Sequence, residues 1–371
     1  MISHQKLSLL SSVLFLLSAC DPKSGENTQV EFDRVAMYTH LADELIMPAL
    51  RRFQSELDIL QATLDSLAAQ PQTAQLAAAQ AQWKKTALAW QKAELYCRFG
   101  PGSFHLAVFQ INNFPAKASE VEAFASQTNP DLNTADARSA RGLPALDYLL
   151  FGGGTSPAEI ATLYANSSTR RAYLQALAQH LQASFEPVLQ EWEQSYLAKF
   201  KTNDGTGSTQ SLALLTNAFT SHNDDLEKLK VRFALNLTFE GESLGAVRPD
   251  LLEAPYSRYS KELALAASQS ALDFFMGNDL SGQVPSFYTY LIALDRKTAS
   301  GQVFANEARS RLQAVADAFE PVQGDFYTAL SEEATDMRAI FDRMREAIVS
   351  IKSDLFVAFG VNRSGTDTDG D

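Results

Sequence analysis

Long stretches of the sequence place apolar residues three and four positions apart, the spacing that gathers them on one face of an α-helix. An early run consists of Leu57, Leu60, Leu64 and Leu67. Two later runs keep the same spacing: Leu174, Leu177, Leu181, Phe185, Val188, Trp192 and Tyr196, and then Met337, Ile340, Met344, Ile348, Ile351 and Leu355. Sustained two-residue alternation of β-branched residues is absent from the sequence. The pattern predicts an all-α fold in which long amphipathic helices pack as antiparallel bundles.

Three prolines, Pro48, Pro187 and Pro321, fall inside these helical patterns. Proline lacks the backbone N–H and its ring clashes with the preceding turn, so we expect a kink or a break at each one. A polar, glycine-containing stretch over residues 202–209 predicts a loop between two helices of one assembly.

Two short apolar segments are similar to each other. Residues 145–152 read Ala-Leu-Asp-Tyr-Leu-Leu-Phe-Gly, and residues 271–277 read Ala-Leu-Asp-Phe-Phe-Met-Gly. Each ends in a glycine that can cap a helix. The similarity favours two related bundles, although apolar helices also resemble one another by chance. We therefore expect an N-terminal bundle over residues 31–240, a C-terminal bundle over 241–360 and a disordered acidic tail over 361–371.

The N-terminus has the pattern of a bacterial export signal. Lys6 precedes an apolar run from Leu7 to Leu17, and Leu17-Ser18-Ala19-Cys20 has the form of a lipobox. The run is too short to span a bilayer. We predict a signal peptide over residues 1–19, a lipid on Cys20 and a flexible tether over 20–30; an ordinary signal peptide is the alternative. The chain is then anchored in the cell envelope facing the periplasm, and the choice of membrane stays open.

The charge of the chain and its cysteine content limit which binding partners and which disulfide bonds we expect. Lys and Arg number 31 against 44 Asp and Glu, a formal charge of −13. Such a surface repels nucleic acid, so no nucleic-acid partner is expected. With Cys20 carrying lipid, Cys97 has no partner for a disulfide in the mature chain, and its apolar neighbours favour a buried thiol.

Few residues suggest catalysis. The sequence contains no HExxH, GxSxG or Walker A motif, and we assign no catalytic residue. His222 lies between Phe219 and Leu226 on an apolar stripe, which is typical of a hydrogen-bonded core histidine. His105 lies in an aromatic loop, where packing is favoured over a functional role.

One ordered set of segments resembles a known family. It comprises Trp83, Trp90 and Glu94, then Phe99-Gly100-Pro101, Asn113-Phe114-Pro115 and the stretch Gly142-Leu-Pro-Ala-Leu-Asp-Tyr-Leu-Leu-Phe-Gly152. This order resembles the imelysin-like family, classified as peptidase family M75. Tyr256-Ser257 and Ser260 resemble its second half, so the resemblance covers roughly residues 31–360. It implies two bundle-like halves, export to the envelope and an association with bacterial iron uptake and, historically, with peptidase activity.

The chain departs from the family at its G-x-H-x-x-E motif. Gly142 matches the glycine, whereas Pro144 replaces the histidine and Asp147 replaces the glutamate. Proline offers no metal ligand and instead suits the first turn of a helix. A site for iron or another hard cation requires Asp147, Glu94 and His105 to converge. Alternatively, Asp147 is a charge near the helix N-terminus or a structural hydrogen-bond acceptor.

These features favour a non-catalytic binding or accessory protein of the envelope, connected with iron uptake and partnered by iron-uptake components. A metallopeptidase is a second hypothesis, which the lost histidine weakens because a metal-bound water is required. A third is a peptide or protein interaction module that uses the groove between the bundles.

Overall fold

The early apolar stripe lies on α2 (Met47–Ala69), in a computed structural model that describes residues 31–100, 108–154, 156–332 and 334–363. Its four leucines are buried where α2 packs against α3 (Thr73–Ala93) and α8 (Ser168–Glu191). The later stripes are buried along α8 with η5 (Trp192–Tyr196) and along α16 (Thr335–Phe359). Burying each such side chain contributes about 1.5–3 kcal/mol. The predicted all-α class is confirmed, since the described residues form helices, with only two isolated β-bridges.

Several shorter helical segments, some π-helical and some 3-10, connect or extend the long helices. In chain order the other elements are α1 (Arg34–His40), η1 (Leu41–Ile46), η2 (Glu94–Cys97), α5 (Ala118–Ala125), η3 (Ala135–Ala140), α6 (Gly142–Asp147), η4 (Tyr148–Gly152), α7 (Pro157–Asn166), α9 (Leu197–Thr202), α10 (Ser211–Glu227), η6 (Lys228–Arg232), α11 (Phe233–Leu235), η7 (Pro249–Leu251), α12 (Ser260–Met276), α13 (Phe287–Leu294), α14 (Phe304–Asp317) and α15 (Phe326–Glu332).

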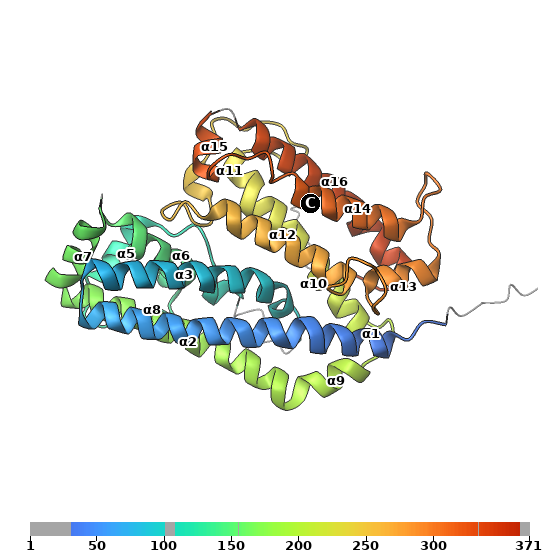
Figure 1. Cartoon of the computed structure of the whole chain (residues 1–371), viewed down its shortest axis with the longest axis horizontal. Coiled ribbons are helices and arrows are strands. Elements are labelled where there is room, and N and C mark those ends of the chain that lie inside the picture. The colour runs from blue at the N-terminus through green and yellow to red at the C-terminus, as the bar shows by residue number, and fades with distance from the viewer. Residues whose placement is uncertain (1–30, 101–107, 155, 333, 364–371) are drawn as a thin grey trace, which may run out of the picture. The chain divides into compact units, whose positions relative to one another are not determined.

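The long helices form two groups that share one contact surface. In the first group α2 packs against α3 and α8, and in the second α10, α12, α14 and α16 pack against one another. The groups meet where α12, orange in Figure 1, contacts α3, drawn in teal above the blue α2. This meeting surface matters for function, because it brings the end of α3 close to α10.

The three prolines have different consequences. Pro48 is the second residue of α2, the helix that directly follows the π-helical segment η1. Pro187 lies inside α8, which passes into the π-helical η5 five residues later. Pro321 lies beyond the end of α14, in the turn before α15. The expected break is present at Pro321, whereas α8 continues past Pro187 to Glu191 and Pro48 occupies the first turn of α2, where proline is tolerated.

The predicted loops and caps are confirmed in part. The polar stretch near residue 205 forms the connection from α9 to α10, as predicted. Gly277 closes α12 in the left-handed conformation at φ 70°. The expected cap at Gly152 is wrong, because the chain continues through η4 into Gly153 at φ −78°, in the right-handed region.

The other organisational predictions fall partly outside the described residues. The signal peptide, Cys20, the tether to residue 30 and residues 364–371 lie there, while Val361 is buried. The described residues from Phe32 onward belong to one compact unit. Helix α10 precedes the predicted boundary near residue 240 yet contacts α12 and α16, and the boundary itself stays a prediction. Among the described residues, no helix has both the length and the apolar character needed to cross a membrane.

Candidate functional site

A cavity of about 800 Å³ lies where the end of α3 meets α10. Its other walls come from η2, residues 108–114, η6 and α16. Cavities of this volume are in the usual range for small-molecule sites. The lining combines aromatic rings, such as Trp90 and Phe114, with amides, hydroxyls and several charged side chains.

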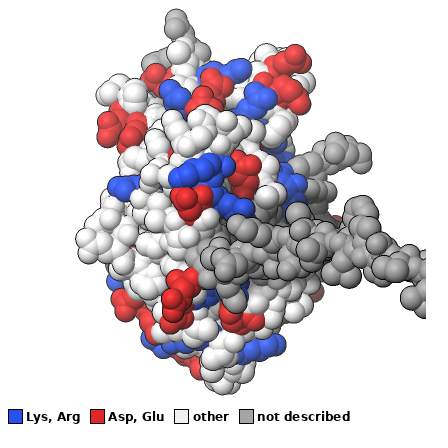
Figure 2. Space-filling view, turned by 90° about the vertical axis from the view of Figure 1, so that its right-hand side faces the viewer, with Lys and Arg blue, Asp and Glu red and all other residues white. Residues whose placement is uncertain are grey.

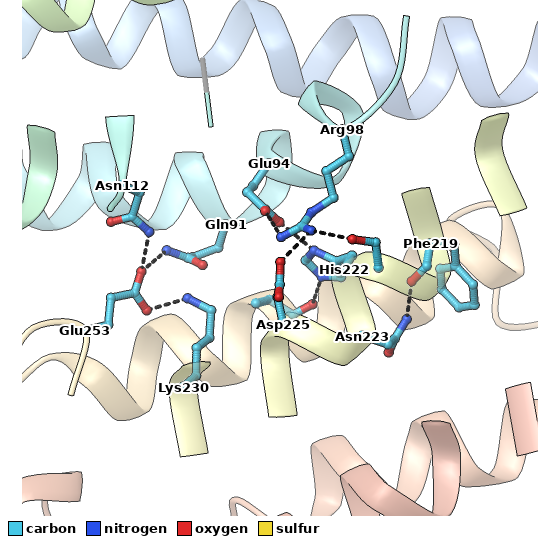
Figure 3. Close-up of polar contacts among 12 residues, drawn as sticks. Gln91, Glu94, Arg98, Asn112, Phe219, His222, Asn223, Asp225, Lys230 and Glu253 are labelled. Atoms are coloured by element: carbon cyan, nitrogen blue, oxygen red, sulfur yellow. Dashed lines mark hydrogen bonds and ion pairs between the residues drawn. The ribbon is translucent and has the colours of Figure 1, made fainter. Parts of the chain in front are cut away.

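Glu94, which the sequence analysis names as a candidate metal ligand, lies in the wall of this cavity. One carboxylate oxygen is 2.6 Å from Nδ1 of His222 on α10, and the other accepts from Arg98, one helical turn away. Arg98 also donates to Asp225 at 2.7 Å and to Ser221 at 2.9 Å. Figure 3 shows these side chains converging from η2 and α10. The contacts hold four ionisable groups in a fixed arrangement across two helices.

His222 has an oxygen partner at each ring nitrogen. The ring is 2% exposed, and its Nε2 lies 3.3 Å from the carbonyl oxygen of Ala267 on α12. Both ring nitrogens therefore face oxygen atoms. Burial by itself raises the pKa of Glu94, but Arg98 and His222 outweigh it and hold that pKa well below its usual range. Glu94 therefore stays ionised, and its negative charge is balanced by its charged partner Arg98.

A second carboxylate network lies beside the first. Glu253, 3% exposed, accepts from Gln91 at 2.9 Å and from Asn112 at 2.7 Å through the same oxygen. Its other oxygen is paired with Lys230. Gln91, Asn112 and Lys230 line the cavity, and Figure 3 shows all three side chains directed at Glu253. Glu253 therefore holds the amide groups of Gln91 and Asn112 and the ammonium group of Lys230 in place at the cavity wall.

The motif stretch around Gly142 is held by contacts of its own. Gly142 has φ 76°, and a Cβ there would overlap the carbonyl oxygen of Ile111, so only glycine fits. Pro144 occupies the first turn of α6, as predicted, and is buried. The indole nitrogen of Trp83 donates to the carbonyl of Leu143 at 3.0 Å. The motif glycine and tryptophan therefore hold α6 in place by packing and by backbone contacts.

Asp147 is fully buried, and its two oxygens accept the backbone N–H groups of Tyr256 and Ser257, each at 3.0 Å. Burial raises its pKa to about 7, although the hydrogen bonds from Tyr256 and Ser257 lower the pKa in part. This geometry matches one alternative that the sequence left open, in which Asp147 is a structural hydrogen-bond acceptor. Pro144 offers no donor atom and both Asp147 oxygens are engaged, so these two residues do not fit the metal-binding pair of a G-x-H-x-x-E motif.

The predicted cation site of Asp147, Glu94 and His105 is not assembled within the described residues. Asp147 bonds to residues 256 and 257, whereas Glu94 bonds to Arg98 and His222. His105 lies outside the described residues. Within the described part of the chain, no group of three or more His, Cys, Asp or Glu side chains could hold a metal ion. The cation site stays a prediction.

Sequence reasoning identified part of the cavity wall and missed the rest. It correctly placed His222 in the core and Cys97 as a buried thiol, whose pKa burial raises. It missed the pairing of His222 with Glu94, which lies 128 positions away. It also missed Glu253, which has no motif around it. A local signal was available for Arg98, because Glu94 and Arg98 have the i, i+4 spacing of helical ion pairs.

Comparisons with known proteins agree with this architecture. A crystal structure named as an iron-regulated protein A precursor from Parabacteroides distasonis superimposes with a TM-score of 0.69 at 15% identity, covering 88% of this chain and 94% of that one. An imelysin-like protein from Psychrobacter arcticum gives a TM-score of 0.64 at 18% identity, with 90% and 98% covered. A comparison with curated proteins finds no match. The family model described as imelysin, of peptidase family M75, matches residues 46–350. The chain therefore belongs to the imelysin family.

Proposed function

We propose that this chain is a non-catalytic binding protein of the bacterial envelope that supports iron uptake, tethered to a membrane through a lipid on Cys20. The observation that carries the proposal is the cavity of about 800 Å³, whose wall is fixed by the Glu94, Arg98 and His222 network. A relative of the same fold is named as iron-regulated, which motivates the connection with iron.

The state of the carboxylates supports binding over hydrolysis. Hydrolysis by a metallopeptidase needs an open metal position and a general base. Glu94 is paired with Arg98 and contacts His222, and Asp147 is engaged by two backbone N–H groups. A wall whose polar groups are already oriented is instead suited to holding a ligand, because little rotamer entropy is lost on binding.

The proposal is tested by iron retention. Purified mature protein is incubated with ferrous ion under anaerobic conditions or with ferric citrate, passed through a desalting column and assayed for bound iron by elemental analysis. We expect protein-bound iron from at least one source. Glu94→Gln should weaken retention on the order of tenfold, since it removes a charge that orients Arg98 and His222.

Glu193→Gln is the matched control, because Glu193 also pairs with an arginine, Arg51, but lies on the exposed surface away from the cavity. Its iron retention should equal that of the unaltered protein. Absence of bound iron from both sources would contradict the proposal. Digestion of casein that a chelator abolishes, and that a mock purification lacks, would establish the peptidase alternative instead.

A further inference from the structure

The charged side chains of the cavity lining are engaged with other groups of the chain. Arg98 pairs with both Glu94 and Asp225. The other cations also have partners: Lys230 pairs with Glu253, Lys352 lies 3.1 Å from Asp224, Arg363 donates to the carbonyl oxygen of Lys352, and Lys228 lies over the ring of Phe233. The face drawn in Figure 2 likewise shows acidic and basic side chains interspersed. A charged ligand would have to compete with these pairs, which favours a ligand without net charge.

Two amide side chains of the lining are oriented by Glu253. Gln91 and Asn112 donate their amide nitrogens to the same carboxylate oxygen, at 2.9 and 2.7 Å (Figure 3). An ionised carboxylate only accepts hydrogen bonds, so each amide must face it with its nitrogen and not with its oxygen. Within the described residues the two amide oxygens accept no hydrogen bond, and neither is enclosed by protein atoms. Because both residues line the cavity, its wall presents two acceptors to a ligand.

Apolar side chains lie in the same lining as these acceptors. Phe109 is 61% exposed, and Val108 and Leu229 are half-buried. Trp90 and Phe114 add aromatic rings to the wall. The carbon skeleton of an organic ligand covers such a surface favourably, because water leaves both the ligand and the wall. The lining therefore suits a molecule that combines an apolar skeleton with hydrogen-bond donors.

From these contacts we propose that the cavity binds an uncharged organic molecule that carries amide or hydroxyl donors on an apolar skeleton. The amide oxygens of Gln91 and Asn112 accept hydrogen bonds from those donors, and the aromatic wall contacts the skeleton. The inference rests on the proposed function and specifies its ligand. Iron then binds most tightly as an organic chelate without net charge, and the metal-free chelator binds through the same contacts.

The test is titration calorimetry of the mature protein with four separate titrants: ferrichrome, which is a peptide-based ferric trihydroxamate without net charge, its metal-free form, ferric citrate and ferrous ion. We expect both forms of ferrichrome to bind more tightly than ferric citrate. Their affinity should stay unchanged as salt is added, because no ion pair forms with the ligand. Asn112→Ala should weaken ferrichrome binding about tenfold, since one hydrogen-bond acceptor is lost.

Gln175→Ala is the matched control, because Gln175 also donates to a carboxylate, that of Asp65 at 2.9 Å, but does not line the cavity. Gln91→Ala provides a second lining variant if Asn112→Ala does not fold, which thermal unfolding reports. Tighter binding of ferrous ion or ferric citrate than of either ferrichrome form would overturn the inference and leave the proposed function standing. Equal affinity for ferrichrome with and without iron would support the inference and count against an iron-specific role. Ferrichrome affinity that falls as salt is added, or that neither lining variant changes, would overturn the assignment to an uncharged donor ligand.

Discussion

Asp147 shows how tertiary packing can reverse the ordinary behaviour of a carboxyl group. Burial disfavours its charged form, while the N–H groups of Tyr256 and Ser257 favour it. Burial is the larger effect, and the pKa rises to about 7. The same contacts join two segments that the sequence presents as separate family features, the Gly142 stretch and the Tyr256 segment.

The raised pKa predicts a pH dependence of stability. The unfolded chain releases the Asp147 proton near the usual value of about 4, whereas the folded chain keeps it until about pH 7. Between these values the folded state binds more protons, so the free energy of unfolding falls as pH rises, by up to about 1.4 kcal/mol per pH unit, and levels off above pH 7. This pH dependence is measured by urea unfolding of the unaltered protein and of Asp147→Asn between pH 4.5 and 7.5.

The unaltered protein should lose stability relative to Asp147→Asn as pH rises, because the amide does not titrate. Asp295→Asn is the control, since that side chain is 74% exposed and its left-handed backbone suits asparagine equally well. A difference between the unaltered protein and Asp147→Asn that stays constant with pH would refute the assignment.

At the scale of helices, α12 and α16 each end at a glycine, and the two glycines lie in different surroundings. Gly277 closes α12 at φ 70° and Gly360 closes α16 at φ 63°. A Cβ at Gly277 would lie 2.8 Å from Cγ2 of Val284 and 3.0 Å from Cβ of Ser286, whereas a Cβ at Gly360 meets no atom within 4 Å. The first helix end is therefore constrained by both backbone conformation and packing, and the second by backbone conformation alone.

Replacing these glycines by alanine separates the two effects. Gly360→Ala should lower the free energy of unfolding by about 1 kcal/mol, the cost of a left-handed alanine. Gly277→Ala should cost about 1–3 kcal/mol more, because the neighbouring side chains must shift. Thermal and urea unfolding measure both. Equal losses for the two variants would show that crowding at Gly277 has no energetic effect.

At the scale of the whole molecule, the contact between α3 and α12 together with the packing of α10 assembles the cavity. Glu94 and His222 are separated by 128 positions, and Asn112 and Glu253 by 141. Deleting one partner of such a buried charge network leaves another group unpaired, which costs about 3–5 kcal/mol. The cavity therefore depends on the two helix groups keeping their contact.

The proposed lipid anchor concerns the whole chain, and Cys20→Ser tests it. In cells that export the protein, this change should move it from the membrane fraction to the soluble fraction and abolish labelling by radioactive palmitate, because the thiol is the attachment point. Cys97→Ser should stay with the membrane, since that thiol is buried. Membrane association of Cys20→Ser equal to that of the unaltered protein would contradict a lipid anchor.

The sequence by itself determined the all-α class, the helix stripes and the burial of His222 and Cys97, because periodicity and apolar neighbours are local properties. It also indicated the family through ordered segments, and Gly142 and Pro144 adopt the roles their chemistry requires. It did not determine that Glu94 pairs with His222, that Glu253 gathers Gln91 and Lys230, or that Asp147 binds the backbone at residue 256. These contacts depend on how α3, α10 and α12 pack. Only the tertiary structure decides which distant groups share a low-dielectric interior, and thereby which charges are neutralised and which face the cavity.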